Sequence, residues 1–337
     1  MKINNHYVPK TYLKQWAKGT KIYEYALLVS HERVPKWKEA SISRTSSVNS
    51  LYIYYDKGEM NDEMEDYFSE EFEMKYTSFI NKVNTYLPFD ENDNEYVAKL
   101  IASQYLRTLS GFHRIQKFIV ESFPSTIEEI ITDMEKENHE TEIFTVKNES
   151  KQNSLIPLNL DFYDISQEKA ALKVETYAGK SLWIFAMKHM LSSTYKVLNE
   201  ISWCVYDAPT NFSWVTTDDP VIFLNYYGNE GYDFNGGWGR KNTNIIFPLS
   251  PKKLLFAQIG QVPKASYKTA TYSFANTIQK YIVEHAFSKI YSEDKNNRIT
   301  KIRKRTADKK KFNEFYDSVK RFHESYIENE VPYLSKN

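Results

Sequence analysis

The segment from Phe212 to Phe223, FSWVTTDDPVIF, decides how the rest of this chain is interpreted. Each of its two apolar, β-branched runs predicts a β-strand, and the Asp-Asp-Pro between them predicts a sharp turn or a jog. Two further apolar runs, at 245–251 and 254–257, repeat the pattern. Acidic side chains at strand ends beside a buried sheet often build a site, so we expect the functional site near Asp218 and Asp219.

The two acids are expected to have different roles. In an extended chain neighbouring side chains point to opposite faces, so Asp218 and Asp219 would chelate poorly together. We assign Asp218 to the site and expect Asp219 to satisfy turn amides before Pro220, while keeping Asp219 as a candidate for substrate binding. Ser250 lies between two prolines and has no nucleophile motif, which is typical of a turn. We keep Ser250 as a further substrate-binding candidate.

The composition predicts a folded protein with a sizeable core. The chain has 337 residues, of which 41% are hydrophobic and 26% charged, and this excludes global disorder. Lys+Arg 44 balance Asp+Glu 44, so net charge alone does not indicate a nucleic-acid partner. A single cysteine, Cys204, excludes a disulfide framework within one chain. A polar N-terminus and the lack of any apolar run of about 18 residues predict a cytoplasmic protein with no membrane partner.

Helical and strand periodicities alternate along the chain. Apolar residues recur at helical spacing in five segments, which are 61–84, 94–122, 124–137, 166–198 and 268–286. The polar residues 138–165 predict a surface loop. Strands are predicted in four segments, which are 21–30, 51–55, 203–257 and 288–292.

This pattern predicts an α+β fold. We expect a mixed or largely antiparallel sheet built from residues 21–55 and 201–292, with a helical lobe of about 61–198 packed on it. One domain would cover 1–294, and a basic helical extension would cover 295–337.

Two polar residues interrupt the apolar face of the helix predicted at 94–122. Gln104 falls in the middle of that face and Arg107 at its edge. An unpaired buried amide costs ~1–3 kcal/mol, so Gln104 needs a partner and is a candidate substrate donor. Arg107 can grip a phosphate or carboxylate with its planar fork. The alternative for Arg107 is a buried salt bridge to a helix acid such as Glu73.

His6 lies in an unusually apolar setting for a residue near a chain end. Tyr7, Val8, Tyr12 and Trp16 surround it in sequence, which indicates that this end is tied down rather than frayed. His6 can be a general base or a ligand, or a core histidine held by hydrogen bonds. Tyr12 is a further candidate for substrate contact.

Four short motifs occur in a fixed order along the chain. They are His6-Tyr7-Val8-Pro9 followed by Tyr12-Leu13, Gln104-Tyr105-Leu106-Arg107-Thr108, Thr217-Asp218-Asp219-Pro220-Val221 and Pro248-Leu249-Ser250-Pro251. The set resembles a bacterial family catalogued as domain of unknown function 4238, and Asn276 and Ile290-Tyr291-Ser292 are similar to the end of that family. The family usually has an amide at the position of Asp219, which favours Asp218 as the essential acid. The resemblance implies a bacterial, cytosolic protein and no established activity.

Two classes of function fit these residues. In the first, the protein is a hydrolase or nuclease acting on nucleic acid or a nucleotide, with a role in anti-phage defence. His6 would then be the general base, Arg107 the phosphate clamp, and Asp218 the group that orients His6 or water. In the second, the same cluster serves a non-catalytic sensor or interaction protein that binds a small anion or a partner protein. A catalytic cluster must open onto a cleft, whereas a structural network is sealed.

The basic C-terminal stretch offers a separate hypothesis. Four of its residues are candidates for contact with nucleic-acid phosphates, namely Lys301, Arg303, Lys304 and Arg305. The alternatives are a solvated charged face, or an extension that Phe315, Val319 and Phe322 dock onto the core. The histidines lack metal-binding spacing, so no metal site and no cofactor are predicted; dependence on a divalent metal and the oligomeric state stay open.

Overall fold

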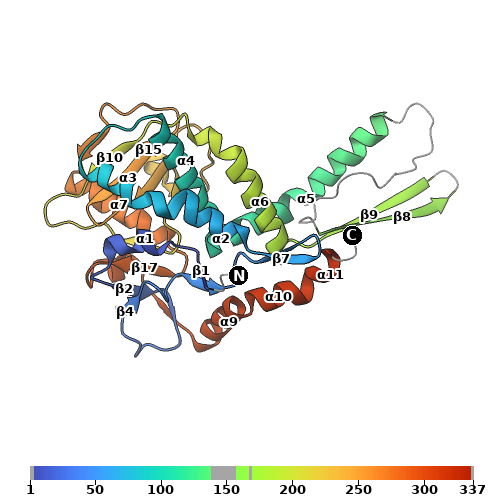
Figure 1. Ribbon diagram of the computed structural model, residues 1–337, viewed down its shortest axis with the longest axis horizontal. Coiled ribbons are helices and arrows are strands. Elements are labelled where there is room, and N and C mark those ends of the chain that lie inside the picture. Colours follow the sequence, from blue (N-terminus) through green and yellow to red (C-terminus); the bar gives the residue numbers. More distant parts are fainter. Residues whose placement is uncertain (1–3, 138–156, 167–168, 335–337) are drawn as a thin grey trace.

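The computed structural model describes residues 4–137, 157–166 and 169–334 (Figure 1). Two main sheets share the fold with a helical lobe, which confirms the predicted α+β class. Within these residues, no helix is both long and apolar enough to cross a bilayer.

The larger sheet has six strands and is almost wholly antiparallel. Its order is β13 (Tyr232–Asp233), β12 (Ile222–Tyr226), β14 (Asn244–Pro248), β15 (Lys253–Gln258), β10 (Cys204–Asp207) and β16 (Tyr267–Thr269). Only β10 and β16 pair in parallel. The predicted strand region of 203–257 supplies five of these strands, so the alternation of apolar and polar residues predicted the strands of this region.

The smaller sheet joins strands from both ends of the sequence. Its order is β11 (Thr216–Thr217), β17 (Lys289–Ser292), β2 (Lys21–Ala26) and β4 (Lys38–Ser41). All three pairings are antiparallel. Residues 21–41 and 216–292 therefore meet in one sheet, although the predicted single sheet is divided into two.

The segment Phe212 to Phe223 connects the two sheets. Its first strand, β11, pairs with β17 in the smaller sheet, and its second, β12, pairs with β14 in the larger one. The Asp-Asp-Pro between them is the crossing point rather than a hairpin turn. The short N-terminal helices α1 (Lys10–Leu13) and η1 (Lys14–Trp16) dock on this segment, because Trp16 Nε1 donates to the backbone oxygen of Trp214 at 2.8 Å.

The helical lobe begins with α2 (Glu63–Phe68), the π-helical turn η2 (Ser69–Glu73) and α3 (Met74–Asn84), which together follow the predicted helix of 61–84. Next come α4 (Glu91–Leu106) and α5 (Leu109–Glu137). The helix break therefore lies at Arg107 and Thr108, and the prediction of a break near Pro124 was wrong.

Local contacts explain where the helix breaks. Thr108 Oγ1 accepts from the amide of Gly111 at 2.9 Å, which starts a new helix. A Cβ on Gly111 would lie 2.4 Å from the backbone oxygen of Leu106, so only glycine allows the two helices to meet this closely. Pro124 is tolerated inside α5 because its neighbour one turn earlier, Val120, is exposed and its carbonyl can bind water instead.

A hairpin replaces the end of the loop predicted at 138–165 and the start of the helix predicted at 166–198. Strands β8 (Leu158–Ser166) and β9 (Lys169–Thr176) pair antiparallel, and the helix α6 covers only Lys180–Ser192. The alternation of apolar and polar residues in 158–176 has a period of two, which a helix cannot use. Of the loop predicted at 138–165, residues 138–156 lie outside the described part. Further along, α7 (Tyr272–His285) fits the predicted helix of 268–286, except that the first predicted residues belong to β16.

The C-terminal residues form four helices: α8 (Ile299–Ile302), α9 (Lys309–Lys320), α10 (Phe322–Asn329) and α11 (Val331–Leu334). Figure 1 shows α9 to α11 running along one side of the molecule, from the smaller sheet toward the base of α5 and α6. The ring of Phe322 lies 5.0 Å from that of Phe112, centroid to centroid, and Tyr326 is buried. These helices pack on the rest of the chain, as the docking alternative expects.

Candidate functional site

The structure brings His6 and Arg107 together. Arg107 follows α4 directly, and its Nη2 donates to the backbone oxygen of His6 at 2.5 Å, with Glu73 Oε1 at 3.4 Å. The guanidinium carbon lies 4.2 Å from the ring centre of Phe68. Arg107 is thus held by a backbone carbonyl, a carboxylate and an aromatic face, which includes the salt bridge to Glu73 that the sequence offered as the alternative.

Burial decides the protonation of His6. Desolvation, with the positive charges of Lys10 and Arg107, lowers the pKa of His6 to about 4. The imidazole is therefore neutral at pH 7, as a general base requires, but only 4% of His6 is exposed. His6 Nε2, Arg107 Nη1 and both amide atoms of Gln104 have no hydrogen-bond partner within the described residues. Such groups are costly in a sealed interior.

The turn amides that Asp219 was expected to satisfy are not bonded to its carboxylate, and it is Asp218 that holds a turn. The carboxylate of Asp218 accepts from the amides of Phe287 and Ser288 and from the Ser288 hydroxyl, so it holds the turn that precedes β17. Its hydrogen bonds do not reach His6. Burial raises the pKa of Asp218 to about 6 in spite of these bonds. The amide of Asp219 is satisfied by Thr217 Oγ1 at 3.2 Å, so turn satisfaction does not need the Asp219 carboxylate.

The Asp219 carboxylate instead forms a buried ion pair. Arg114 on α5 donates to it from Nη1 at 2.5 Å and from Nη2 at 3.2 Å, and His285 Nε2 lies 3.6 Å away. Burial raises the pKa of Asp219, but the charges of Arg114 and His285 outweigh it and the pKa is lowered overall. Sequence reasoning missed Arg114 and His285, although His285 follows Ile278 and Ile282 at helical spacing on the buried face of α7, a signal that could have found it.

Tyr12 and Ser250 serve the framework. The Tyr12 hydroxyl lies 2.6 Å from Thr216 Oγ1 and donates to the backbone oxygen of Pro248 at 2.7 Å, which ties the N-terminal helix to both sheets. Ser250 Oγ accepts from the amides of Lys252 and Lys253, as its turn reading expects.

The motif residues are sealed from solvent. Gln104 and Arg107 are fully buried, and Asp218 and Asp219 are each 1% exposed. These residues do not open onto a cleft in the conformation seen, whereas a catalytic cluster has to.

Comparison with known proteins places the chain in a family. Residues 4–296 match the model of the family described as "Protein of unknown function (DUF4238)". The chain belongs to the DUF4238 family. No curated protein and no solved structure matches the chain significantly. The family match covers both sheets and the helical lobe of this DUF4238 member, and it ends just before α8.

A cavity of about 620 Å³ opens between α7 and α8, and we call it the amide cavity. Its polar lining comprises four carboxamides, three cations, one carboxylate and one hydroxyl, from Asn211, Asn276, Gln279, Asn296, Lys280, Arg298, Lys301, Glu284 and Ser213. Phe212, Ile299 and Ile302 add apolar surface. The single carboxylate is already engaged, because the Tyr232 hydroxyl donates to Glu284. The cavity therefore favours an anion.

The amide cavity is anchored to the segment that joins the sheets. Gln279 Oε1 accepts from the amide of Val215 at 3.3 Å, and Gln279 is 5% exposed. Arg298 Nη2 donates to Asn276 Oδ1 at 3.0 Å, which orients that carboxamide. Asn276, outside the four motifs, is one of the residues similar to the end of the family, and it lines this cavity.

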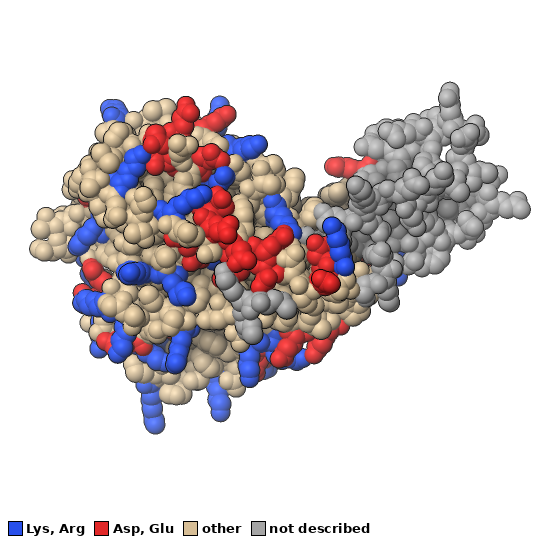
Figure 2. All heavy atoms as spheres, viewed as in Figure 1, with Lys and Arg blue, Asp and Glu red and all other residues tan. Residues whose placement is uncertain are grey.

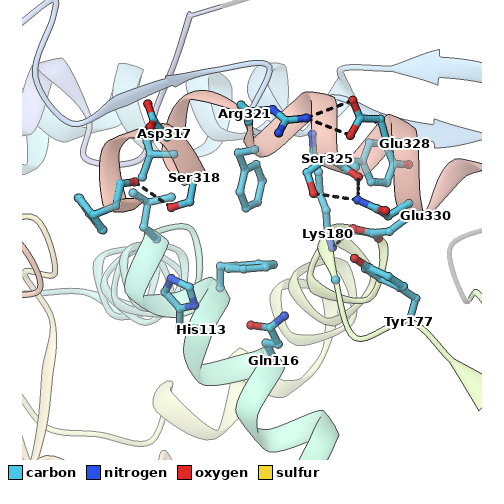
Figure 3. Close-up of a pocket in the computed structure, with 18 of the residues that line it drawn as sticks. His113, Gln116, Tyr177, Lys180, Asp317, Ser318, Arg321, Ser325, Glu328 and Glu330 are labelled. Atoms are coloured by element: carbon cyan, nitrogen blue, oxygen red, sulfur yellow. Dashed lines mark hydrogen bonds and ion pairs between the residues drawn. The ribbon is translucent and has the colours of Figure 1, made fainter. Parts of the chain in front are cut away.

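A second cavity of about 480 Å³ lies between α5, the start of α6, α9 and α10 (Figure 3), and we call it the C-terminal cavity. Its polar groups are largely paired with one another. Gln116 Nε2 donates to the backbone oxygen of Ala178, and Arg321 Nη2 is paired with Glu328 at 3.1 Å. Lys180 Nζ donates to the backbone oxygen of Ser50 at 2.7 Å. This cavity offers a ligand fewer free groups than the amide cavity does.

The four basic residues of the C-terminal stretch divide into two pairs. Arg303 donates to the backbone oxygens of Val283, Glu284 and Ala286 at the end of α7, and Arg305 donates to those of Glu32, Val34 and Pro35. Lys301 and Lys304 are exposed, and no carboxylate of the described chain pairs with them. Only these two remain available to a ligand.

The surface charge is uneven. Figure 2 shows acidic side chains gathered in the middle of the viewed face, over α2, whose first turn carries Glu63, Glu65 and Asp66. A polyanion would be repelled there. Within the described residues, no three His, Cys, Asp or Glu side chains gather as metal ligands.

Proposed function

We propose that the protein binds a phosphorylated small molecule of nucleotide size in the amide cavity, and that it acts as a sensor or interaction protein rather than an enzyme. The observation that carries the proposal is the cavity's lining. No carboxylate of the described residues pairs with Arg298 or Lys301, while the one carboxylate of the lining, Glu284, is shared by Lys280 and the Tyr232 hydroxyl. Arginine and lysine are the usual partners of phosphate oxygens, arginine through its fork and lysine as a point charge.

The remaining lining suits the rest of a nucleotide. Carboxamides both donate and accept, so Asn211, Asn276 and Asn296 match ring edges and hydroxyls that carry both kinds of group. Phe212 and Ile302 supply an apolar wall for a ring. A volume of about 620 Å³ lies within the range of small-molecule sites.

Catalysis has less support. The first hypothesis, a hydrolase or nuclease with an anti-phage role, requires His6, Arg107 and Asp218 to meet a substrate, and all three are buried. The amide cavity itself is lined by no histidine or cysteine of the described chain. Its one hydroxyl, on Ser213, donates to Glu293 Oε1 and accepts from Lys252 Nζ, so its hydrogen bonds are already taken up within the protein.

Calorimetry with the full-length protein tests the proposal. The titrants are inorganic phosphate and nucleoside mono-, di- and triphosphates, and phosphate release is measured in the same samples. We expect Arg298→Ala to raise Kd about tenfold or more, since a charged hydrogen bond contributes about 1.5–3 kcal/mol. Arg44→Ala, which removes an exposed arginine elsewhere, is the matched control and should bind as wild type.

Two outcomes would overturn the proposal. One is the absence of binding by every titrant. The other is phosphate release that His6→Ala abolishes in a folded protein, because this would make the protein a hydrolase.

A further inference from the structure

A third cavity lies across α8 from the amide cavity, and we call it the lysine cavity. It has a volume of about 630 Å³ and is lined by Tyr25, Glu32, Lys36, Asn297, Thr300, Lys301, Lys304 and Arg305. Lys301 lines both cavities. The two cavities therefore meet at α8, one on each side of a four-residue helix.

The lysine cavity carries unused positive charge. Lys36, Lys301 and Lys304 are exposed, and within the described chain none of them is paired with a carboxylate. The one acid of the lining, Glu32, is 4.0 Å from Arg305, whose side chain is only 7% exposed. Three free ammonium groups thus face solvent around one partly engaged carboxylate, and an anion is the ligand that would gain most there.

The wall between the cavities is held in place. Ile299 is buried at 1% exposure, which fixes α8 on its inner side. Arg303 and Arg305 follow α8 and grip backbone carbonyls of α7 and of the loop at 32–35. Because α8 is anchored on both sides, Lys301 is presented between two preformed cavities.

We propose that the two cavities form one binding track for a single-stranded nucleic acid, which crosses α8 at Lys301. This inference rests on the proposed function and extends it, because the ligand of the amide cavity becomes one nucleotide of a longer strand. A helix with its side chains is about 10–12 Å across, so a ligand that uses both cavities needs phosphates on both sides of it. A single strand supplies phosphates at regular intervals.

The shape of the track favours a single strand over other polyanions. A base enters a cavity of nucleotide size only when it is not paired in a duplex, and the carboxamides of the amide cavity would face such a base. A carboxylate side chain of an acidic protein would leave most of a cavity of about 620 Å³ unfilled. A single-stranded nucleic acid is therefore the ligand that would use both the positive charge of the lysine cavity and the volume of the amide cavity.

Fluorescence anisotropy with the full-length protein tests the inference. The probes are labelled single-stranded DNA and RNA hexamers, the corresponding duplexes, and a labelled mononucleotide. We expect Lys36→Ala and Lys304→Ala each to weaken hexamer binding roughly threefold or more and to reduce the salt slope by about 0.7, while leaving mononucleotide binding unchanged. Arg298→Ala should weaken both. Lys117→Ala, an exposed lysine on α5, is the control.

The outcomes separate the two proposals. If the mononucleotide binds but the hexamer binds no more tightly, or if Lys36→Ala and Lys304→Ala bind the hexamer as wild type, the track is refuted and the proposed function stands. Equal binding of poly-glutamate and the hexamer also refutes the track, in favour of an acidic protein partner. If neither probe binds, both proposals fail.

Discussion

The carboxylate of Glu330 accepts hydrogen bonds from the backbone amides of Lys180 and Ser181, both at 2.8 Å, although 150 residues separate Glu330 from Lys180. These amides open α6, where a helix leaves its first N–H groups unsatisfied and attracts negative charge. Glu330, which lies between α10 and α11, therefore caps the N-terminus of α6 (Figure 3). The C-terminal helices are part of the fold, and a truncation before them would uncover this helix end.

Removing that cap should destabilise the protein. Glu330 is 4% exposed and provides both acceptors, so we expect Glu330→Ala to lower the free energy of unfolding by about 2–3 kcal/mol. Urea unfolding followed by circular dichroism measures it. Glu328→Ala is the matched control, since its pair with Arg321 is exposed and contributes at most about 1 kcal/mol. Equal losses in the two variants would show that the cap is not important.

The same contact leaves no room for a side chain at Gly179. A Cβ at Gly179 would lie 2.3 Å from Glu330 Oε1, closer than atoms can approach. We expect Gly179→Ala to cost about 2 kcal/mol through displacement of the Glu330 side chain. Gly237→Ala, whose Cβ would meet only an ordinary contact at 3.7 Å, should change the melting temperature little. A Gly179→Ala protein as stable as wild type would mean that Glu330 moves freely.

Lys180 should make stability depend on pH. Burial lowers the pKa of Lys180 to about 7, although Glu330 opposes this, while an unfolded lysine titrates near pH ~10.4. Between these values the unfolded chain binds the additional proton, so stability should rise with pH through this window, by at most about 1.4 kcal/mol per pH unit. The comparison is the unfolding free energy of wild type minus that of Lys180→Met, measured from pH 7 to 10.

His323 provides the control for that experiment. Its Nδ1 lies 3.1 Å from Lys180 Nζ, and burial, with the charge of Lys180, lowers its pKa to about 4. The contribution of His323 to the free energy of unfolding should therefore rise between pH ~4 and ~6.5, which is below the range in which Lys180 acts. A difference between wild type and Lys180→Met that is flat from pH 7 to 10 would refute the assignment to Lys180.

Arg107 should matter for stability more than for ligand binding, contrary to the expectation from sequence. Lysine keeps the charge but cannot reach the His6 carbonyl and Glu73 with one planar group, so we expect Arg107→Lys to cost about 1–3 kcal/mol. Unfolding and nucleotide affinity are measured on the same preparation. A stable variant that has lost nucleotide binding would instead return Arg107 to the site.

Local patterns predicted the elements but not the partners of their polar side chains. Alternating and helical periodicities located the strands of 203–257 and the helix of 61–84, because burial of one face acts on every second residue or every third to fourth. The break at Arg107 escaped prediction, since it depends on a close approach between Gly111 and the backbone oxygen of Leu106. Pro124 was a stronger local signal for a helix break, but the exposed position of Val120, one turn earlier, makes the free-energy cost of this proline inside α5 small.

The sequence by itself determined the α+β class, the family and the importance of FSWVTTDDPVIF. These follow from residue types that are close together in the chain, whose periodicity and turn preferences act locally. Only the tertiary structure decided that this segment crosses between two sheets, that Asp219 rather than Asp218 meets an arginine, and that Glu330 caps α6. The ion pair of Asp219 and the Glu330 cap join residues at least 105 positions apart, and the crossing requires β11 to pair with β17 while β12 pairs with β14. Such contacts depend on how the sheets and helices pack. For the same reason the amide cavity, which residues 211–302 form around α7 and α8, has no signature in any one stretch of sequence.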